Sequence, residues 1–77
     1  MNALAKLRWQ CRRGTLELDL LLTRYLENGY ASATAEEKAL FVELLTFEDD
    51  VLLEILMGGI GNPPSRMKSV INSIRNP

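Results

Sequence analysis

The sequence predicts an all-α fold: a compact bundle of five short helices in one domain that spans residues 1–77. Apolar residues recur at helical spacing in five separate segments. The alternating pattern of strands and the turn signals of hairpins are absent from the sequence. A length of 77 residues, of which 47% are hydrophobic and 25% charged, fits one small globular domain with a limited core.

The first helix is expected over residues 3–13 and the second from Thr15, as N-cap, to about Asn28. The apolar stripe of the first consists of Leu4, Leu7 and Cys11. That of the second consists of Leu18, Leu21, Leu22, Tyr25 and Leu26. Leu16 and Leu20 widen the second stripe, so this helix is expected to be apolar around much of its circumference and central in the bundle.

The third helix begins at a capping box, Thr34-x-x-Glu37, in which two side chains satisfy two otherwise unpaired amides. Its buried stripe is expected to be Leu40, Phe41, Leu44 and Leu45. A fourth helix is expected over about 49–57, with the acids of residues 48–50 at its positive end. These acids lack the spaced oxygen ligands and the glycine of a calcium loop, so capping and solvation are favoured over a metal site.

The fifth helix is expected over about 63–75, with Asn62 as N-cap and Pro63 at its first position. Its apolar stripe consists of Met67, Val70, Ile71 and Ile74. The segment has few acids and several hydroxyl and amide side chains. We therefore expect it to be a less firmly docked, more mobile terminal element.

Between the first two helices, both signs of charge surround a glycine. Gly14 is expected to take positive φ and end the first helix. Arg12 and Arg13 would then lie at a helix C-terminus, with Glu17 and Asp19 in the first turn of the next helix, where the helix dipole favours each charge. Two interpretations remain open: charges matched to the dipoles of a helix corner, or Arg13 and Glu17 projecting outward to contact a partner.

Trp9 and Cys11 each have two interpretations. Trp9 lies away from the first apolar stripe and is either an exposed interface anchor beside the arginines or an aromatic packed across a core edge. Cys11 is either a small buried hydrophobe or a nucleophile whose pKa the neighbouring cations lower. Histidine is absent from the sequence, so no imidazole is available to activate the thiol.

The composition disfavours an enzyme. One cysteine and no histidine cannot form a Cys-rich or histidine zinc site, and Glu17 and Asp19, two residues apart on a helix, point in different directions. No dinucleotide fingerprint is present, so we expect no stably bound cofactor. A single cysteine favours the reducing cytoplasm.

Charge and hydropathy disfavour a nucleic-acid partner, a signal peptide and a membrane span. The net charge is −1 and the pI about 5.3, whereas a nucleic-acid-binding domain usually has a pI above about 9. No secretory h-region and no long uncharged apolar run is found, so we expect neither a signal peptide nor a membrane span. We expect a monomeric interaction protein.

The run from Trp9 to Asp19 resembles the small flavinylation factors of the SdhE family, also called succinate dehydrogenase assembly factors. Their R-G-x-x-E motif is matched by Arg13, Gly14 and Glu17. The likeness continues through Glu37-Lys38, residues 41–45 and the acids of residues 48–50, and covers nearly the whole chain apart from its C-terminal tail. One departure is Asp50, where a proline is expected in many relatives.

The resemblance implies a chaperone-like function. Proteins of this family promote covalent attachment of FAD to the flavoprotein subunit of succinate dehydrogenase, and of the similar fumarate reductase. By this resemblance Arg13, Gly14 and Glu17 contact that subunit near its flavin-linking histidine, with Arg12, Asp19 and Trp9 beside them. FAD would act in the partner, so the chemistry belongs there and this chain supplies alignment.

Two alternatives stay open at this point. A family member has also been interpreted as the antitoxin of a toxin–antitoxin pair, which is again a protein-binding function. A small enzyme that uses Cys11 is the other alternative, and loss of turnover on Cys11→Ser but not on Glu17→Ala would support it.

Overall fold

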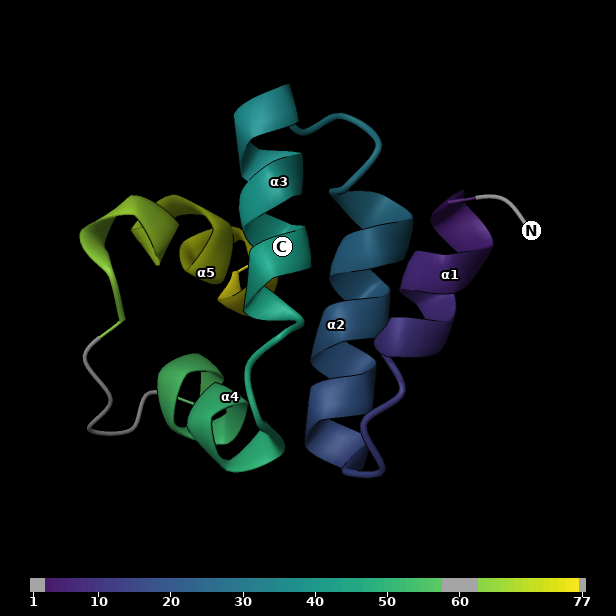
Figure 1. The fold of residues 1–77 in the computed structure, drawn as a ribbon, viewed down its shortest axis with the longest axis vertical. Helices are drawn as coiled ribbons and strands as arrows, with labels where there is room; N and C mark the ends of the chain where they lie inside the picture. The colour runs from purple at the N-terminus through teal and green to yellow at the C-terminus, as the bar shows by residue number, and fades with distance from the viewer. Residues whose placement is uncertain (1–2, 58–62, 77) are drawn as a thin grey trace.

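The computed structural model describes residues 3–57 and 63–76. These residues form five α-helices and one short 3₁₀ helix, and no strand is found among them (Figure 1). The helices are α1 (Ala3–Gln10), α2 (Leu16–Asn28), α3 (Ala35–Leu44), α4 (Asp49–Leu56), η1 (Ser65–Met67) and α5 (Lys68–Arg75). The predicted all-α fold is confirmed.

Two helices hold the bundle together. α2 packs against α1, α4 and α5, and in Figure 1 it runs between α1 and α3. α5 packs against α2, α3 and α4. The expected central position of α2 is therefore confirmed, and α5 shares it.

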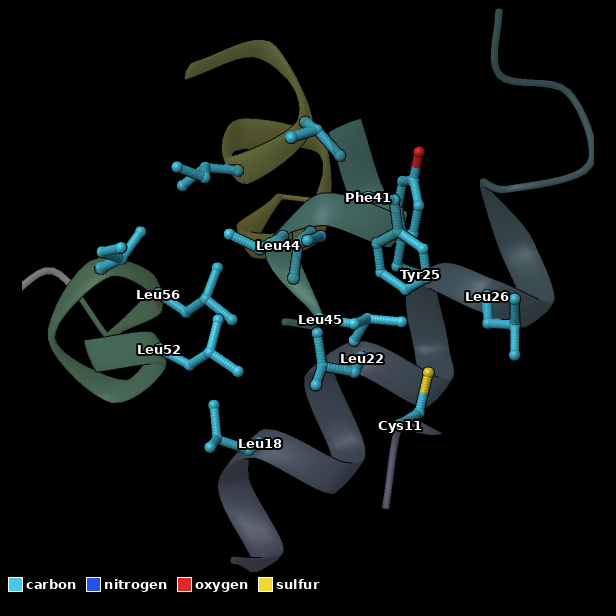
Figure 2. Packing of buried hydrophobic residues seen from close by; sticks show 14 of the residues in the cluster. Cys11, Leu18, Leu22, Tyr25, Leu26, Phe41, Leu44, Leu45, Leu52 and Leu56 are labelled. Carbon is cyan, nitrogen blue, oxygen red and sulfur yellow. The ribbon is translucent and has the colours of Figure 1, made fainter. Parts of the chain in front are cut away.

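The core lies where the inner faces of these helices meet, and Figure 2 shows most of it. α2 contributes Leu18 and Leu22, which are fully buried, and Tyr25, whose ring centroid lies 4.8 Å from that of Phe41 in α3. The Tyr25 hydroxyl donates a 2.7 Å hydrogen bond to Glu37 Oε2, so the one polar atom of this aromatic pair has a partner. The aromatic contact fixes α3 against α2.

α1 is shorter than predicted. It ends at Gln10, with a last turn in which the amide of Arg12 bonds to Trp9 O at 3.1 Å. The next amide, that of Arg13, is bonded to Asp19 Oδ1 and so does not continue the helical ladder. Gly14 therefore lies in the link between α1 and α2, and the prediction that it ends the first helix is wrong. Leu4, assigned to the apolar stripe of the first helix, is 47% exposed.

α2 begins and ends as predicted, with two differences. Thr15 is in the N-cap position, yet its hydroxyl caps no amide among the described residues. Leu16 and Leu20 are exposed, because they lie on the side of α2 away from the core. α2 is thus apolar around much of its circumference, as expected, but these two leucines do not belong to its buried face.

The N-terminus of α3 follows half of the predicted capping box. Thr34 Oγ1 accepts a 3.1 Å hydrogen bond from the Glu37 amide, as expected. The Glu37 carboxylate is used elsewhere, since Oε1 accepts from Ser69 Oγ at 3.3 Å and Oε2 from Tyr25. Glu37 thus links α3 to α2 and α5 and does not return to Thr34.

The fifth helix begins later than predicted. Pro63 precedes Pro64, and a residue before proline is disfavoured in the α region, so Pro63 does not occupy a first helical position and the helical turns start at Ser65. Asn62, the predicted N-cap, lies outside the described residues. The predicted stripe of α5 and the preceding turn is buried: Met67, Val70, Ile71 and Ile74. Its greater mobility remains a prediction.

Candidate functional site

The link between α1 and α2 forms a corner of the molecule, at the lower end of both helices in Figure 1. Gly14 is exposed and has φ +84°, so its predicted positive φ is confirmed. A Cβ built at Gly14 would meet no heavy atom of the described residues within 4 Å. The glycine is therefore required by the backbone conformation and not by crowding within the chain.

The side chain of Arg13 turns into the molecule. Its Nε donates to Asp49 Oδ1 at 2.9 Å, and Nη1 donates to Leu45 O at 2.8 Å and to Gln10 O at 3.4 Å. Nη2 donates to Phe47 O at 2.5 Å, and the side chain is only 15% exposed. The interpretation in which Arg13 projects outward is wrong, because its planar guanidinium finds these acceptors within the chain.

Asp19 is the second internal residue of the corner. Its Oδ1 accepts a 2.6 Å hydrogen bond from the main-chain amide of Arg13, and the residue is half-buried. A carboxylate that accepts from a main-chain amide satisfies a donor which would otherwise lack a partner in the link. Of the six predicted site residues, Arg13 and Asp19 thus have their described contacts within the chain.

The other four predicted site residues face solvent. Arg12, Gly14 and Glu17 are exposed, and Trp9 is 76% exposed. The interpretation of Trp9 as packed across a core edge is therefore wrong. Trp9 lines a shallow pocket of about 280 Å³ together with Arg8 and Arg12.

Sequence reasoning missed two parts of the corner. Leu16 and Leu20, 69% and 62% exposed, are four residues apart and so are neighbours on the outer side of α2, and Leu20 is three residues from Glu17. Their positions at the edge of the predicted apolar stripe were the available signal. Asp49 was assigned only to a helix N-terminus, and its pairing with Arg13, 36 residues away, has no local sequence signal.

The described residues offer no support for catalytic chemistry at the corner. Cys11 is fully buried, and burial raises the pKa of its thiol to about 11 against the opposing effect of Arg13. A thiol with a raised pKa is a poor nucleophile. No group of three or more metal-ligating side chains occurs in residues 3–57 and 63–76, and no helix there is long and apolar enough to cross a bilayer.

A small all-helical domain with an exposed corner of arginine, glycine, carboxylate and indole has the features of an interaction module. A family model described as "Flavinator of succinate dehydrogenase" matches residues 5–77. The chain belongs to this family, and the resemblance found from its R-G-x-x-E motif is confirmed.

Named relatives agree with the family match. The FAD assembly factor SdhE of Coxiella burnetii is 43% identical over 70 residues, which is 91% of this chain and 85% of the relative. The protein of the same name from Francisella tularensis is 40% identical over 73 residues, covering 95% of this chain and 76% of the relative. That of Shewanella oneidensis is 38% identical over 72 residues, covering 94% and 88%.

Proposed function

We propose that this chain is a chaperone-like assembly factor that binds the flavoprotein subunit of succinate dehydrogenase and promotes covalent attachment of FAD to it. The observation that supports this most directly is the family match over residues 5–77. The exposed Gly14 and Glu17 of the matched motif add a surface on which such a contact can form.

The proposed contact surface consists of the exposed members of the corner. Glu17 would supply a charge-assisted hydrogen bond, Arg12 a cation, and Trp9 an apolar anchor of the kind that dominates protein interfaces. Gly14 would allow close approach, since open space lies above its Cα. Arg13 and Asp19 would belong to the site through the shape they give to the link.

The chemistry is proposed to reside in the partner. FAD would be bound by the flavoprotein, where its bond to the protein forms, and this chain would not hold the cofactor stably. Alignment of reacting groups alone can lower a barrier substantially, so a factor without a catalytic side chain suffices. We extend the proposal to fumarate reductase as a second partner, to a monomeric state and to a cytoplasmic location.

The antitoxin alternative has no support from the family match. None of the relatives named above is described as an antitoxin. Both functions would use a protein-binding surface, so the presence of such a surface does not separate them. Dependence of covalent flavin attachment on Glu17 would favour the assembly factor over the antitoxin.

The test uses cells that lack this gene, complemented with wild type, Glu17→Ala or Glu36→Ala. Covalent flavin is read as fluorescence of the flavoprotein band on a denaturing gel. Glu36 is the matched control because it is exposed and occupies the same position in the first turn of α3 that Glu17 occupies in α2.

We expect wild type and Glu36→Ala to restore covalent flavin, and a folded Glu17→Ala to fail. Helicity of each purified variant is measured in parallel to confirm folding. Flavin attachment that does not depend on the gene would contradict the proposed function, and restoration by Glu17→Ala would contradict the proposed surface.

A further inference from the structure

Arg13 joins parts of the chain that lie far apart in the sequence. Its guanidinium bonds to the end of α1 through Gln10 O, to the link between α3 and α4 through Leu45 O and Phe47 O, and to the first residue of α4 through Asp49. Only Asp49 among these acceptors is a side chain. It is therefore the one acceptor that a substitution can remove.

The planar geometry of the guanidinium couples its bond with Asp49 to its bonds with the loop carbonyls. Arg presents its donors in a rigid planar fork, so a carboxylate at Nε fixes the plane in which Nη1 and Nη2 meet the two loop carbonyls. The Asp49 side chain is 44% exposed, whereas that of Arg13 is 15% exposed. Asp49 is thus the more exposed member of a pair whose arginine is mostly enclosed.

The consequence for the corner follows from chain connectivity. Gly14 directly follows Arg13, and the Arg13 amide is itself fixed to Asp19 in the first turn of α2. The position of Gly14 and the direction in which Glu17 faces the solvent therefore depend on where Arg13 is held.

We infer that Asp49 is a positioning residue for flavinylation: through Arg13 it holds the Gly14–Glu17 corner in the shape that the flavoprotein binds. The inference rests on the proposed function and adds to it a residue outside the R-G-x-x-E motif. The effect of Asp49 on the partner passes through Arg13.

Direct contact between Arg13 and the partner would give a different result on substitution of Asp49. If the guanidinium bound the flavoprotein itself, removal of the Asp49 carboxylate would leave that cation in place and binding would survive. If Arg13 acts by position, removal of either partner loosens the same corner. The double variant is then no worse than Arg13→Gln, because the Asp49 carboxylate acts only through the guanidinium that Arg13→Gln removes.

The experiment measures binding of the full-length chain to the purified flavoprotein subunit, and the yield of covalent flavin, for Arg13→Gln, Asp49→Ala and the double variant. The amide resonance of Gly14 reports the shape of the corner in the free protein. Asp50→Ala is the matched control, since Asp50 is also in the first turn of α4 and accepts its described hydrogen bond from the Val51 amide. Ile55→Val, a shortened buried side chain of α4, controls for lost stability.

All measurements are made at a temperature at which circular dichroism shows every variant to be folded. We expect Arg13→Gln and the double variant to lose binding and flavin yield by the same factor, about ten- to a hundredfold, as expected for misplaced recognition groups, and Asp49→Ala to lose at least about tenfold. The Gly14 resonance should move in all three, and both controls should behave as wild type.

Wild-type binding by Asp49→Ala, with or without a defect in Arg13→Gln, would overturn the inference while leaving the proposed function intact. A double variant much weaker than Arg13→Gln would also overturn it, because Asp49 would then act on the partner by a route other than Arg13. If the wild-type chain itself neither binds the flavoprotein nor raises covalent flavin, the proposed function fails and the inference fails with it.

Discussion

The main-chain amide of Arg13 donates a 2.6 Å hydrogen bond to Oδ1 of Asp19, and this bond closes the link between α1 and α2 around Gly14. Asp19 lies in the first turn of α2, where the positive end of the helix dipole favours its charge. One carboxylate therefore stabilises both the helix N-terminus and the turn before it. The conformation of Gly14 is fixed by this closure, and it can be tested separately from partner binding.

Substitution of Gly14 should act first on stability. Gly14→Ala places a side chain at φ +84° and is expected to lower the free energy of unfolding by about 1–2 kcal/mol, while Gly14→Asn, which tolerates positive φ better, should cost less. Urea unfolding measures both. An alanine variant as stable as wild type would contradict the assigned backbone conformation. A stable Gly14→Asn variant that supports no flavinylation would show that the partner approaches this position closely.

Trp9 should be dispensable for folding. Its side chain is 76% exposed, so Trp9→Ala is expected to change the free energy of unfolding by less than about 0.5 kcal/mol. Affinity for the flavoprotein subunit should fall at least about tenfold, as for an interface anchor. Titration of the subunit with each variant measures this, and Leu4→Ala, at another exposed position of α1, is the control. A large loss of stability in Trp9→Ala would instead indicate a packing function.

Cys11 should make the fold weaker at alkaline pH. Its pKa is raised by burial from 9.0 to about 11, so above pH 9 the unfolded chain loses the thiol proton before the folded chain does. Stability attributable to this group is therefore complete below pH 9 and is lost as pH rises toward 11, by about 1 kcal/mol between pH 8 and pH 10.

The comparison of wild type with Cys11→Ala isolates this effect. The Tyr25 pKa is also raised, by burial and then by the bond to Glu37, and Tyr25 is present in both proteins. Urea unfolding at pH 8, 9 and 10 should show a steeper loss for wild type. Equal slopes would contradict a buried, protonated thiol. Flavinylation should survive Cys11→Ala, because Cys11 has no catalytic task in the proposed function.

α5 should be indispensable to the core. A chain that ends at Pro64 loses the buried side chains Met67, Val70, Ile71 and Ile74. Each such side chain contributes about 1.5–3 kcal/mol, and their sum is comparable to the whole stability of a small domain. We expect no cooperative thermal transition in this chain, whereas a chain that ends at Arg75 should unfold as the full chain does. Hydrogen exchange of α5 amides against those of α2 measures the predicted mobility directly.

The helices were predictable because their signals are local. The apolar stripe of α2 and the Thr34 cap depend on residues within one or two turns of each other, and both are found in the structure. The exposure of Leu16 and Leu20 had only a weak signal, their place at the edge of the stripe, since an apolar helix does not reveal which side lacks a neighbour. The first-turn position of Glu17 left its outward direction open, and the inward direction of Arg13 depended on carbonyls of a link 32 and 34 residues away.

The 36-residue separation between Arg13 and Asp49 has a consequence during protein synthesis. The chain leaves the ribosome from its N-terminus, so the R-G-x-x-E motif emerges before α4 exists. The motif can take its final shape only after residue 49 is free to fold back onto it. A truncated product that stops before Asp49 carries the complete motif as sequence and lacks the corner as a structure, so it should not compete with finished molecules for the flavoprotein.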